Sequence, residues 1–263
     1  MKTIISDLDG TLLNDGELST ETIETLKQFQ ENNRLVLATG RNLNSVKKIY
    51  QQLEMDKYQT GALILINGLA FYDFKDQEFI YLNSFKEKDI TKIIKIAYRF
   101  FFRITIVTKE KRLTIPNLYD KIYQILRFLI KHKPIEKTKK EKIPAQAEKI
   151  ELGGTIFFDF FLRRLKRSLH NYEVVQVSRF WIEILPKRTN KVNQVKYLID
   201  KYQIALDDLY VFGDGENDFE MLKYANNSYA PEDALPEAKQ VAKFSCLSAR
   251  KNGVAKVVYQ LIK

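Results

Sequence analysis

The sequence predicts an α/β fold, in which a Rossmann-like, doubly wound parallel sheet forms a core and an α+β domain is inserted into it. Short apolar runs typical of buried strands alternate with amphipathic segments of helix length in both the first and last thirds of the chain. Polar, glycine-containing clusters follow several of these runs, at the points where parallel strands should end. The middle of the chain differs, because its strand-like segments alternate and it carries most of the basic charge.

The first third of the chain supplies the first half of the predicted core. Strand–helix–strand alternation with these segment lengths favours right-handed βαβ units and therefore a parallel sheet. A helix is expected to begin after Ser19, which has the side chain of a capping residue, and to bury Ile23, Leu26 and Phe29. The other elements expected here are strands at 3–6, 34–38 and 62–66, a helix at 43–53, and a hairpin formed by 70–72 and 79–82.

The remaining chain divides into an insert and a second part of the core. We expect a core domain made of 1–82 and 187–263 and a cap domain made of 83–186, with the lysine-rich stretch 131–142 as a solvated loop. In the cap the expected helices are 90–101, 118–131 and 160–169, and the expected strands are 103–108, 112–115, 172–180 and 181–185. In the second part of the core, the expected helices are 192–202, 219–225 and 253–262, and the expected strands are 209–212, 228–230 and 243–247.

Composition limits the class of protein. The chain has 263 residues, of which 45% are hydrophobic and 29% are charged, as is usual for a soluble globular protein. Cys246 is the one cysteine, which excludes an internal disulfide framework and a cysteine-rich zinc site. We see no signal peptide and no apolar window of about 18 residues, so we expect a cytoplasmic protein without a membrane partner.

The net charge of +10 is unevenly distributed. Residues 83–186 hold 23 Lys and Arg against 11 Asp and Glu, and the rest of the chain has a slight acidic excess. A basic cap would attract small anionic substrates, and it would equally attract nucleic acid.

Four polar clusters follow or begin elements of the predicted core. Carboxylates at the ends of neighbouring parallel strands can bind a hard cation such as Mg²⁺, which often shares its site with phosphate. Gly10 allows the chain to turn, so that the carboxylates on either side of Leu8 could serve one site. The four clusters are Asp7 with Asp9, Thr39 with Gly40, Lys191 alone, and Asp214 with Asn217 and Asp218.

Two of these clusters also suit an anion. Thr39 offers a hydroxyl group and, with Gly40, backbone N–H groups before a predicted helix, where anions bind readily. Lys191 opens the next core helix and can place a point charge on a phosphate. A divalent cation, a lysine and N–H donors around a carboxylate nucleophile indicate phosphoryl transfer.

The order of these motifs resembles that of the haloacid dehalogenase-like phosphohydrolases, specifically the Cof-type group with a large α/β cap. The resemblance covers nearly the whole chain. The matching segments are Asp-Leu-Asp-Gly-Thr-Leu-Leu at 7–13, Thr39-Gly40-Arg41, Asn67-Gly68, Lys191 and Gly213 to Asp218.

The resemblance implies a role for each matching residue. Asp7 would be the nucleophile that becomes aspartyl-phosphate, and Asp9 would protonate the leaving alcohol and then activate water. The phosphoryl group would be held by Leu8, Thr39, Gly40, Lys191 and Asn217. The Mg²⁺ ligands would be Asp7, the backbone carbonyl of Asp9, and Asp214, with Asp218 in support.

The expected function is therefore a Mg²⁺-dependent phosphatase acting on small phosphorylated metabolites such as sugar phosphates. A phosphomutase of the same fold is an alternative. A polyanion-binding protein that uses the basic cap is a further one, but the basic residues lack interleaved aromatics, so no nucleic-acid partner is expected. Departures from the family pattern are Arg188 and Val192 around Lys191, Asp233 in the late segment, and a short cap.

Overall fold

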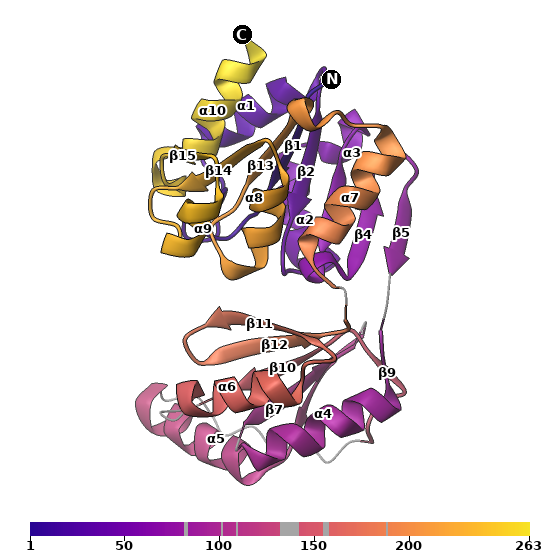
Figure 1. The fold of residues 1–263 in the computed structure, drawn as a ribbon, viewed down its shortest axis with the longest axis vertical. Coiled ribbons are helices and arrows are strands. Elements are labelled where there is room, and N and C mark those ends of the chain that lie inside the picture. The colour runs from indigo at the N-terminus through magenta and orange to yellow at the C-terminus, as the bar shows by residue number, and fades with distance from the viewer. Residues whose placement is uncertain (82–83, 101, 109, 132–141, 155–157, 188) are drawn as a thin grey trace. The chain divides into compact units, whose positions relative to one another are not determined.

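The computed structural model describes residues 1–81, 84–100, 102–108, 110–131, 142–154, 158–187 and 189–263. The chain forms two compact units (Figure 1). Met1–Leu82 and Asn190–Lys263 form the first, which we call the core unit, and Asn83–Thr189 form the second, which we call the small unit. The lysine-rich stretch expected as a loop lies almost entirely outside the described residues.

The core unit is built on an eight-stranded sheet with the strand order β15-β14-β13-β1-β2-β3-β4-β5. The strands from β15 to β3 are parallel, and β4 and β5 are antiparallel. Because β1 lies between β2 and β13, the strand order reverses on either side of it, and ligands bind at such a point in open α/β sheets. The strands are β1 Thr3–Ser6, β2 Arg34–Ala38, β3 Ala62–Leu65, β4 Ala70–Asp73, β5 Glu78–Tyr81, β13 Leu209–Phe212, β14 Asn227–Pro231 and β15 Phe244–Cys246.

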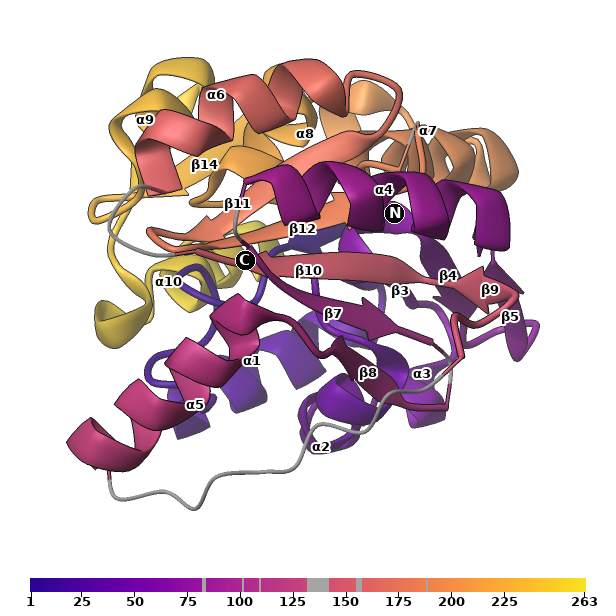
Figure 2. The ribbon, with the colours of Figure 1, turned by 90° about the horizontal axis from the view of Figure 1, so that it is seen from below.

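Helices cover both faces of this sheet (Figures 1 and 2). One face packs against α7, α8 and α9 through a cluster that includes Val195, Met221 and Ala238. The figures show α1, α2 and α10 on the other face. The predicted α/β class with a parallel central sheet is therefore confirmed. The helices are α1 Thr20–Gln30, α2 Leu43–Gln52, α3 Met55–Tyr58, α7 Lys191–Tyr202, α8 Phe219–Tyr224, α9 Pro236–Val241 and α10 Gly253–Ile262.

The small unit has an antiparallel sheet with the order β11-β12-β10-β7-β8. Isoleucines on β7, β10 and β12 pack with α4 and α6 to form its apolar cluster. Two short strands, β6 Phe85–Lys86 and β9 Gln146–Ala147, pair with each other. The other elements are α4 Glu87–Arg99, β7 Arg103–Val107, β8 Arg112–Ile115, α5 Leu118–Lys131, β10 Lys149–Gly153, α6 Phe158–Ser168, β11 Glu173–Ser178 and β12 Trp181–Leu185.

Several elements differ from those expected. β10 is the middle strand of the small sheet, and it is absent from the expectations because two of its five residues, Lys149 and Glu151, are charged. The structure pairs Glu151 with Arg112 and Lys149, so the strand tolerates a buried carboxylate. The third core strand ends at Leu65 rather than 66, because Ile66 already has a φ of 51°. Two short helices, α3 and α9, were not expected.

No helix within the described parts of the chain is both long and apolar enough to cross a membrane.

Candidate active site

The first carboxylate of the site lies directly after β1. The N–H group of Asp7 donates to the carbonyl of Phe212, so the end of β1 stays paired with the end of the neighbouring strand β13. The loop that follows β13 carries Asp214 and Asp218, which brings residues two hundred positions apart to one edge of the sheet. Only 5% of the Asp7 surface is exposed.

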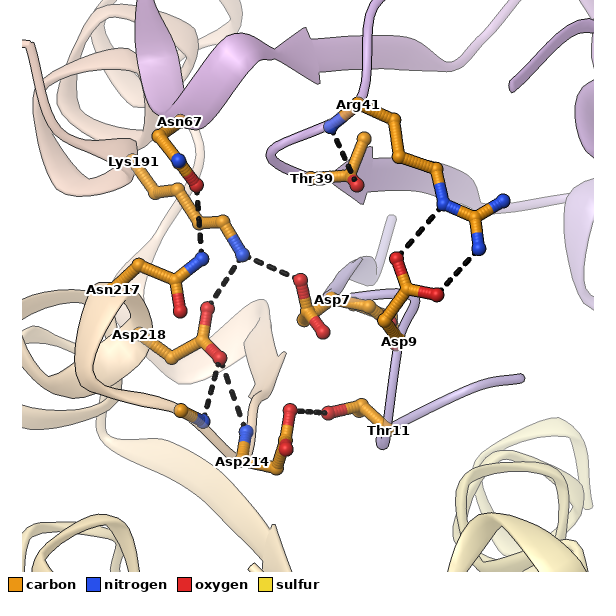
Figure 3. A network of polar contacts seen from close by, with 12 residues as sticks. Asp7, Asp9, Thr11, Thr39, Arg41, Asn67, Lys191, Asp214, Asn217 and Asp218 are labelled. Carbon is orange, nitrogen blue, oxygen red and sulfur yellow. Dashed lines mark hydrogen bonds and ion pairs between the residues drawn. The ribbon is translucent and has the colours of Figure 1, made fainter. Parts of the chain in front are cut away.

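Lys191 lies among these carboxylates. Its Nζ donates to Oδ1 of Asp7 at 2.5 Å and to Oδ1 of Asp218 at 2.7 Å (Figure 3). The side chain is fully buried and begins helix α7, where Asn190 caps the helix by accepting from the N–H of Asn193. Lys191 therefore binds a carboxylate from the loop after β1 and another from the loop after β13.

The second carboxylate oxygen of Asp218 has a different use. Its Oδ2 accepts the backbone N–H groups of Asp214 at 3.1 Å and Gly215 at 3.0 Å. Asp218 therefore fixes the loop that presents Asp214, while it shares Lys191 with Asp7.

The charges in this cluster do not balance. Carboxylate oxygens of Asp7, Asp214 and Asp218 lie within 4.8 Å of one another, and Lys191 is the cation bound between them. Burial raises the pKa of Asp7 well above its ordinary value; Lys191 opposes this, whereas Asp218 and Asp214 add to it. Burial, reinforced by Asp218, raises the pKa of Asp214 to about 6. A group of oxygen ligands with surplus negative charge could hold a metal ion.

The pKa of Lys191 responds in the opposite sense. Burial alone would lower it, but the adjacent carboxylates of Asp218 and Asp7 outweigh burial and raise it above the ordinary lysine value. The lysine therefore remains charged in the site at any physiological pH.

The loop after β1 reaches Asp214 closely because of Gly10. Its φ is +86°, and a Cβ at this position would lie 2.5 Å from Oδ2 of Asp214. Next along the chain, the hydroxyl of Thr11 donates to Oδ1 of Asp214 at 3.0 Å. The carbonyl of Leu8 closes the turn by accepting N–H groups from residues 11–13. Gly10 is thus required both for the turn and for the approach of the two loops.

Asp9 lies differently from Asp7. Its carboxylate is bound by the guanidinium of Arg41, with Nε donating to Oδ2 at 2.8 Å and Nη2 donating to Oδ1 (Figure 3). The Asp9 side chain is 57% exposed, whereas that of Asp7 is 7% exposed. The sequence allowed both carboxylates to serve one site through the turn at Gly10; in the structure the side chain of Asp9 faces Arg41 and lies outside the acidic cluster.

Thr39 and Gly40 follow β2, next to the site, but they offer less than the sequence suggested. The N–H of Thr39 donates to the carbonyl of Ile64 at 2.8 Å and so extends the pairing of β2 with β3. The Thr39 hydroxyl accepts the N–H of Arg41. Helix α2 begins only after its cap, Asn42, so this pair precedes the helix terminus. The hydroxyl remains able to donate, whereas the Thr39 N–H is committed to the sheet.

A short turn after β3 supports the other side of the site. The amide Nδ2 of Asn217 donates to Oδ1 of Asn67 at 2.9 Å (Figure 3). Gly68 has a φ of +94°, and a Cβ there would lie 2.3 Å from the carbonyl of Asn190. This turn therefore packs directly on the start of α7 and helps to set the position of Lys191.

Three residues of the network had no role assigned from the sequence. They are Thr11, Arg41 and Asn67, and each lies inside a motif that the sequence did single out. Of the departures from the family pattern, Val192 packs in the core cluster, Asp233 is exposed, and Arg188 lies outside the described residues.

Comparison with known proteins identifies the family. A family profile described as haloacid dehalogenase-like hydrolase matches residues 4–258. A 5-amino-6-(5-phospho-D-ribitylamino)uracil phosphatase of Bacillus subtilis is 28% identical over 100% of this chain and 98% of its own. A haloacid dehalogenase-like hydrolase from Bacteroides thetaiotaomicron has a TM-score of 0.78 and 25% identity, covering 99% of each chain. A sugar phosphatase of subclass IIB shares the fold, with a TM-score of 0.78 and 18% identity over 100% of both chains. The resemblance and the hydrolase class predicted from the motifs are confirmed, and the chain belongs to the haloacid dehalogenase-like hydrolases.

Proposed function

We propose that this chain is a Mg²⁺-dependent phosphatase that hydrolyses small phosphorylated metabolites, such as sugar phosphates or similar monoesters, in the cytoplasm. The observation that carries the proposal is the placement of Asp7. A buried carboxylate lies within 4.8 Å of two others and is hydrogen-bonded to a buried lysine, as a nucleophile facing an anionic substrate requires.

The core residues divide the work in this proposal. Asp7 attacks phosphorus and forms an aspartyl-phosphate as the bond from phosphorus to the leaving-group oxygen breaks, and Lys191 offsets the charge that develops on the phosphoryl oxygens. Asp7 and Asp214 would be the main ligands for Mg²⁺, which would screen the surplus carboxylate charge and the phosphate charge. Asp218 holds the Asp214 loop, as its two backbone hydrogen bonds indicate.

Proton transfer is assigned to Asp9, which protonates the leaving alcohol and then activates the water that hydrolyses the aspartyl-phosphate to free phosphate. Its carboxylate is exposed and bound by Arg41, so it can exchange that partner for a leaving-group oxygen without crossing a buried environment. The backbone at Leu8 and Gly40, the Thr39 hydroxyl and the Asn217 amide would complete the phosphate contacts. The carbonyl of Asp9 would complete the metal site.

The small unit is proposed to act as a cap that selects the leaving group, within the boundaries 83–186 expected from the sequence. Its basic excess would draw anionic substrates toward the enzyme. The name of the Bacillus subtilis relative, a phosphatase of a phosphorylated ribityl compound, supports a small monoester as substrate.

A screen of phosphorylated metabolites with and without Mg²⁺ tests the proposal, with free phosphate as the product measured. We expect turnover only with the metal, and we expect Asp7→Asn to abolish it. Asp73→Asn is a matched control, because Asp73 is a second buried aspartate bound by a lysine, at the other edge of the sheet. Metal-dependent turnover in Asp7→Asn would refute the nucleophile assignment, and an isomerised sugar without free phosphate would indicate a mutase.

A further inference from the structure

Helix α5 of the small unit is oriented with its polar side inward. Asp120 and Gln124 are buried, although both are polar. Leu118 is 68% exposed, Ile125 is 51% exposed and Leu129 is 62% exposed. The large apolar side chains that this helix exposes are Leu118, Ile122, Tyr123, Ile125, Phe128 and Leu129.

Specific polar contacts hold the helix in this orientation. The Asp120 carboxylate accepts from Nε of Arg103 at 2.8 Å, and the Arg103 guanidinium lies over the ring of Tyr123. The side chain of Asn117 accepts the N–H of Asp120 at 2.6 Å and donates to the carbonyl of Phe102 at 2.8 Å. Because these contacts tie the polar side to β7, the apolar side must face outward.

The exposed side chains form a continuous stripe. Leu118, Ile122, Ile125 and Leu129 are separated by four, three and four positions, which places them along one line of the helix. A contiguous exposed apolar patch of this kind is uncommon on a soluble monomer and marks an interaction surface.

The same unit also exposes a basic surface. Lys88, Lys92, Lys95 and Arg99 follow the same spacing along α4 and, with Glu87 at the start of the helix, line a shallow open depression on its surface. Figure 1 shows α4, α5 and α6 on one side of the small sheet, and Figure 2 shows α4 beside α6, with β10 and β7 between them and α5. Exposed on α6 are Arg163, Arg164 and Arg167. Within the described part of the chain, none of these seven side chains forms an ion pair with an acidic one.

We propose that the small unit docks on an anionic lipid surface, with the α5 stripe in the interface and the α4 and α6 cations on the headgroups. Apolar and basic side chains together are what peripheral binding to such a surface requires. A second copy of this chain would cover the stripe but bring two strongly basic units together. Nucleic acid would neutralise the cations but leave the aliphatic stripe in water. Docking needs no spanning helix, and it does not depend on the proposed function.

The test is flotation of the full chain with lipid vesicles. We expect binding to vesicles that contain phosphatidylglycerol to exceed binding to phosphatidylcholine vesicles by about tenfold or more, and to weaken with salt. Two triple variants remove the two components. They are Ile122→Ser with Ile125→Ser and Leu129→Ser, and Lys88→Glu with Lys92→Glu and Lys95→Glu. Each should lower binding to the anionic vesicles by about tenfold.

Matched variants of the core unit serve as controls. Lys47→Glu with Lys243→Glu and Lys256→Glu changes the net charge equally, and Leu206→Ser with Leu247→Ser and Tyr259→Ser removes three exposed apolar side chains. Both controls should bind as the unmodified chain does, and circular dichroism should show all variants folded.

Results of three kinds would overturn the proposal. The first is equal binding to both kinds of vesicle, or anionic binding that survives the α5 changes. The second is a concentration-dependent dimer in sedimentation that the α5 changes abolish, which would make the stripe a contact between copies. The third is retention of an RNA oligonucleotide through the α4 lysines without any vesicle binding.

Discussion

Helix α7 brings a lysine to a buried aspartate at each of its ends, and the two ends differ in their charge balance. Lys191, its first residue, binds Asp7 at the edge of the sheet where β1 ends. Lys201, in its last turn, binds Asp73 at 2.7 Å. Asp73 pairs in register with Ala62, the first residue of β3, so it lies at the opposite edge.

The environments of the two aspartates explain the difference. Burial would raise the pKa of Asp73, but hydrogen bonds from Lys201, the Tyr202 hydroxyl and the N–H of Lys75 outweigh it and hold the pKa below its ordinary value. Asp7 has one lysine and two carboxylate neighbours, and its pKa is raised. A buried carboxylate with complete hydrogen bonds indicates a structural tie, whereas one with surplus negative charge nearby indicates a site that can bind a cation.

The largest expected contrast follows from removing each lysine. Lys191→Met leaves fully buried carboxylates without their cation, so we expect a loss of about 3–5 kcal/mol in the free energy of unfolding. Hydrolysis should fall about 10²–10³-fold, as when a preorganised donor is lost. Lys201→Met should cost about 1–2 kcal/mol, because Tyr202 and Lys75 still bind Asp73, and should leave turnover within about twofold.

Urea unfolding and steady-state kinetics on both variants check this contrast. If Lys201→Met lowered turnover as far as Lys191→Met does in folded protein, the two ends of α7 would not differ in function.

A smaller contrast is expected when each aspartate is neutralised. Asp73→Asn should lower the free energy of unfolding by about 2–3 kcal/mol, since it weakens a charged and fully bonded group. Asp7→Asn should leave stability unchanged or raise it by about 1 kcal/mol in metal-free protein, because it removes one of the repelling carboxylates. Denaturation midpoints measured in the presence of a chelator compare the two. A large destabilisation by Asp7→Asn would mean that Lys191 fully compensates Asp7.

Much of the fold could be predicted because core strands such as β2 and β13 are short apolar runs bounded by polar motifs. The strands of the small unit were harder to predict from the sequence. Its middle strand, β10, contains Lys149 and Glu151, and their burial depends on ion pairs with side chains on neighbouring strands. Periodicity reports which side chains prefer to be buried, and it does not report which charges find partners.

The same limit applies to the site. The order of the motifs predicted a common site for four residues, because each of them follows or begins a core element. In the structure these residues do lie together: Asp7, Lys191, Asp214 and Asp218. The orientation of Asp9 is set by Arg41, which lies 32 positions away, and this pairing leaves no local signal. A contact of this kind depends on how the strands pair, because the pairing sets which loops lie next to each other.

The smallest expected effect is a dependence of stability on pH and Mg²⁺ through Asp214. The pKa of this carboxyl is raised to about 6 in the folded chain, against about 3.9 in an unfolded one. The folded state therefore binds more protons at Asp214 between these values, so the contribution of this carboxyl to the free energy of unfolding should fall as pH rises from about 4 to about 6 and level off above. The charged carboxylate then costs about 1–3 kcal/mol near neutral pH without metal.

A bound divalent cation should offset that cost, so the stabilisation by Mg²⁺ should be larger near pH 7 than near pH 5, where protons compete for Asp214. Thermal unfolding with chelator or with Mg²⁺ at both pH values measures the difference. Asp214→Asn should abolish most of the Mg²⁺ effect, whereas Asp233→Asn, which changes an exposed carboxylate outside the site, should leave it intact. Equal stabilisation by Mg²⁺ at both pH values would place the ion away from Asp214. The acidic cluster around Lys191 would then differ from the surroundings of Asp73 in charge but not in metal binding.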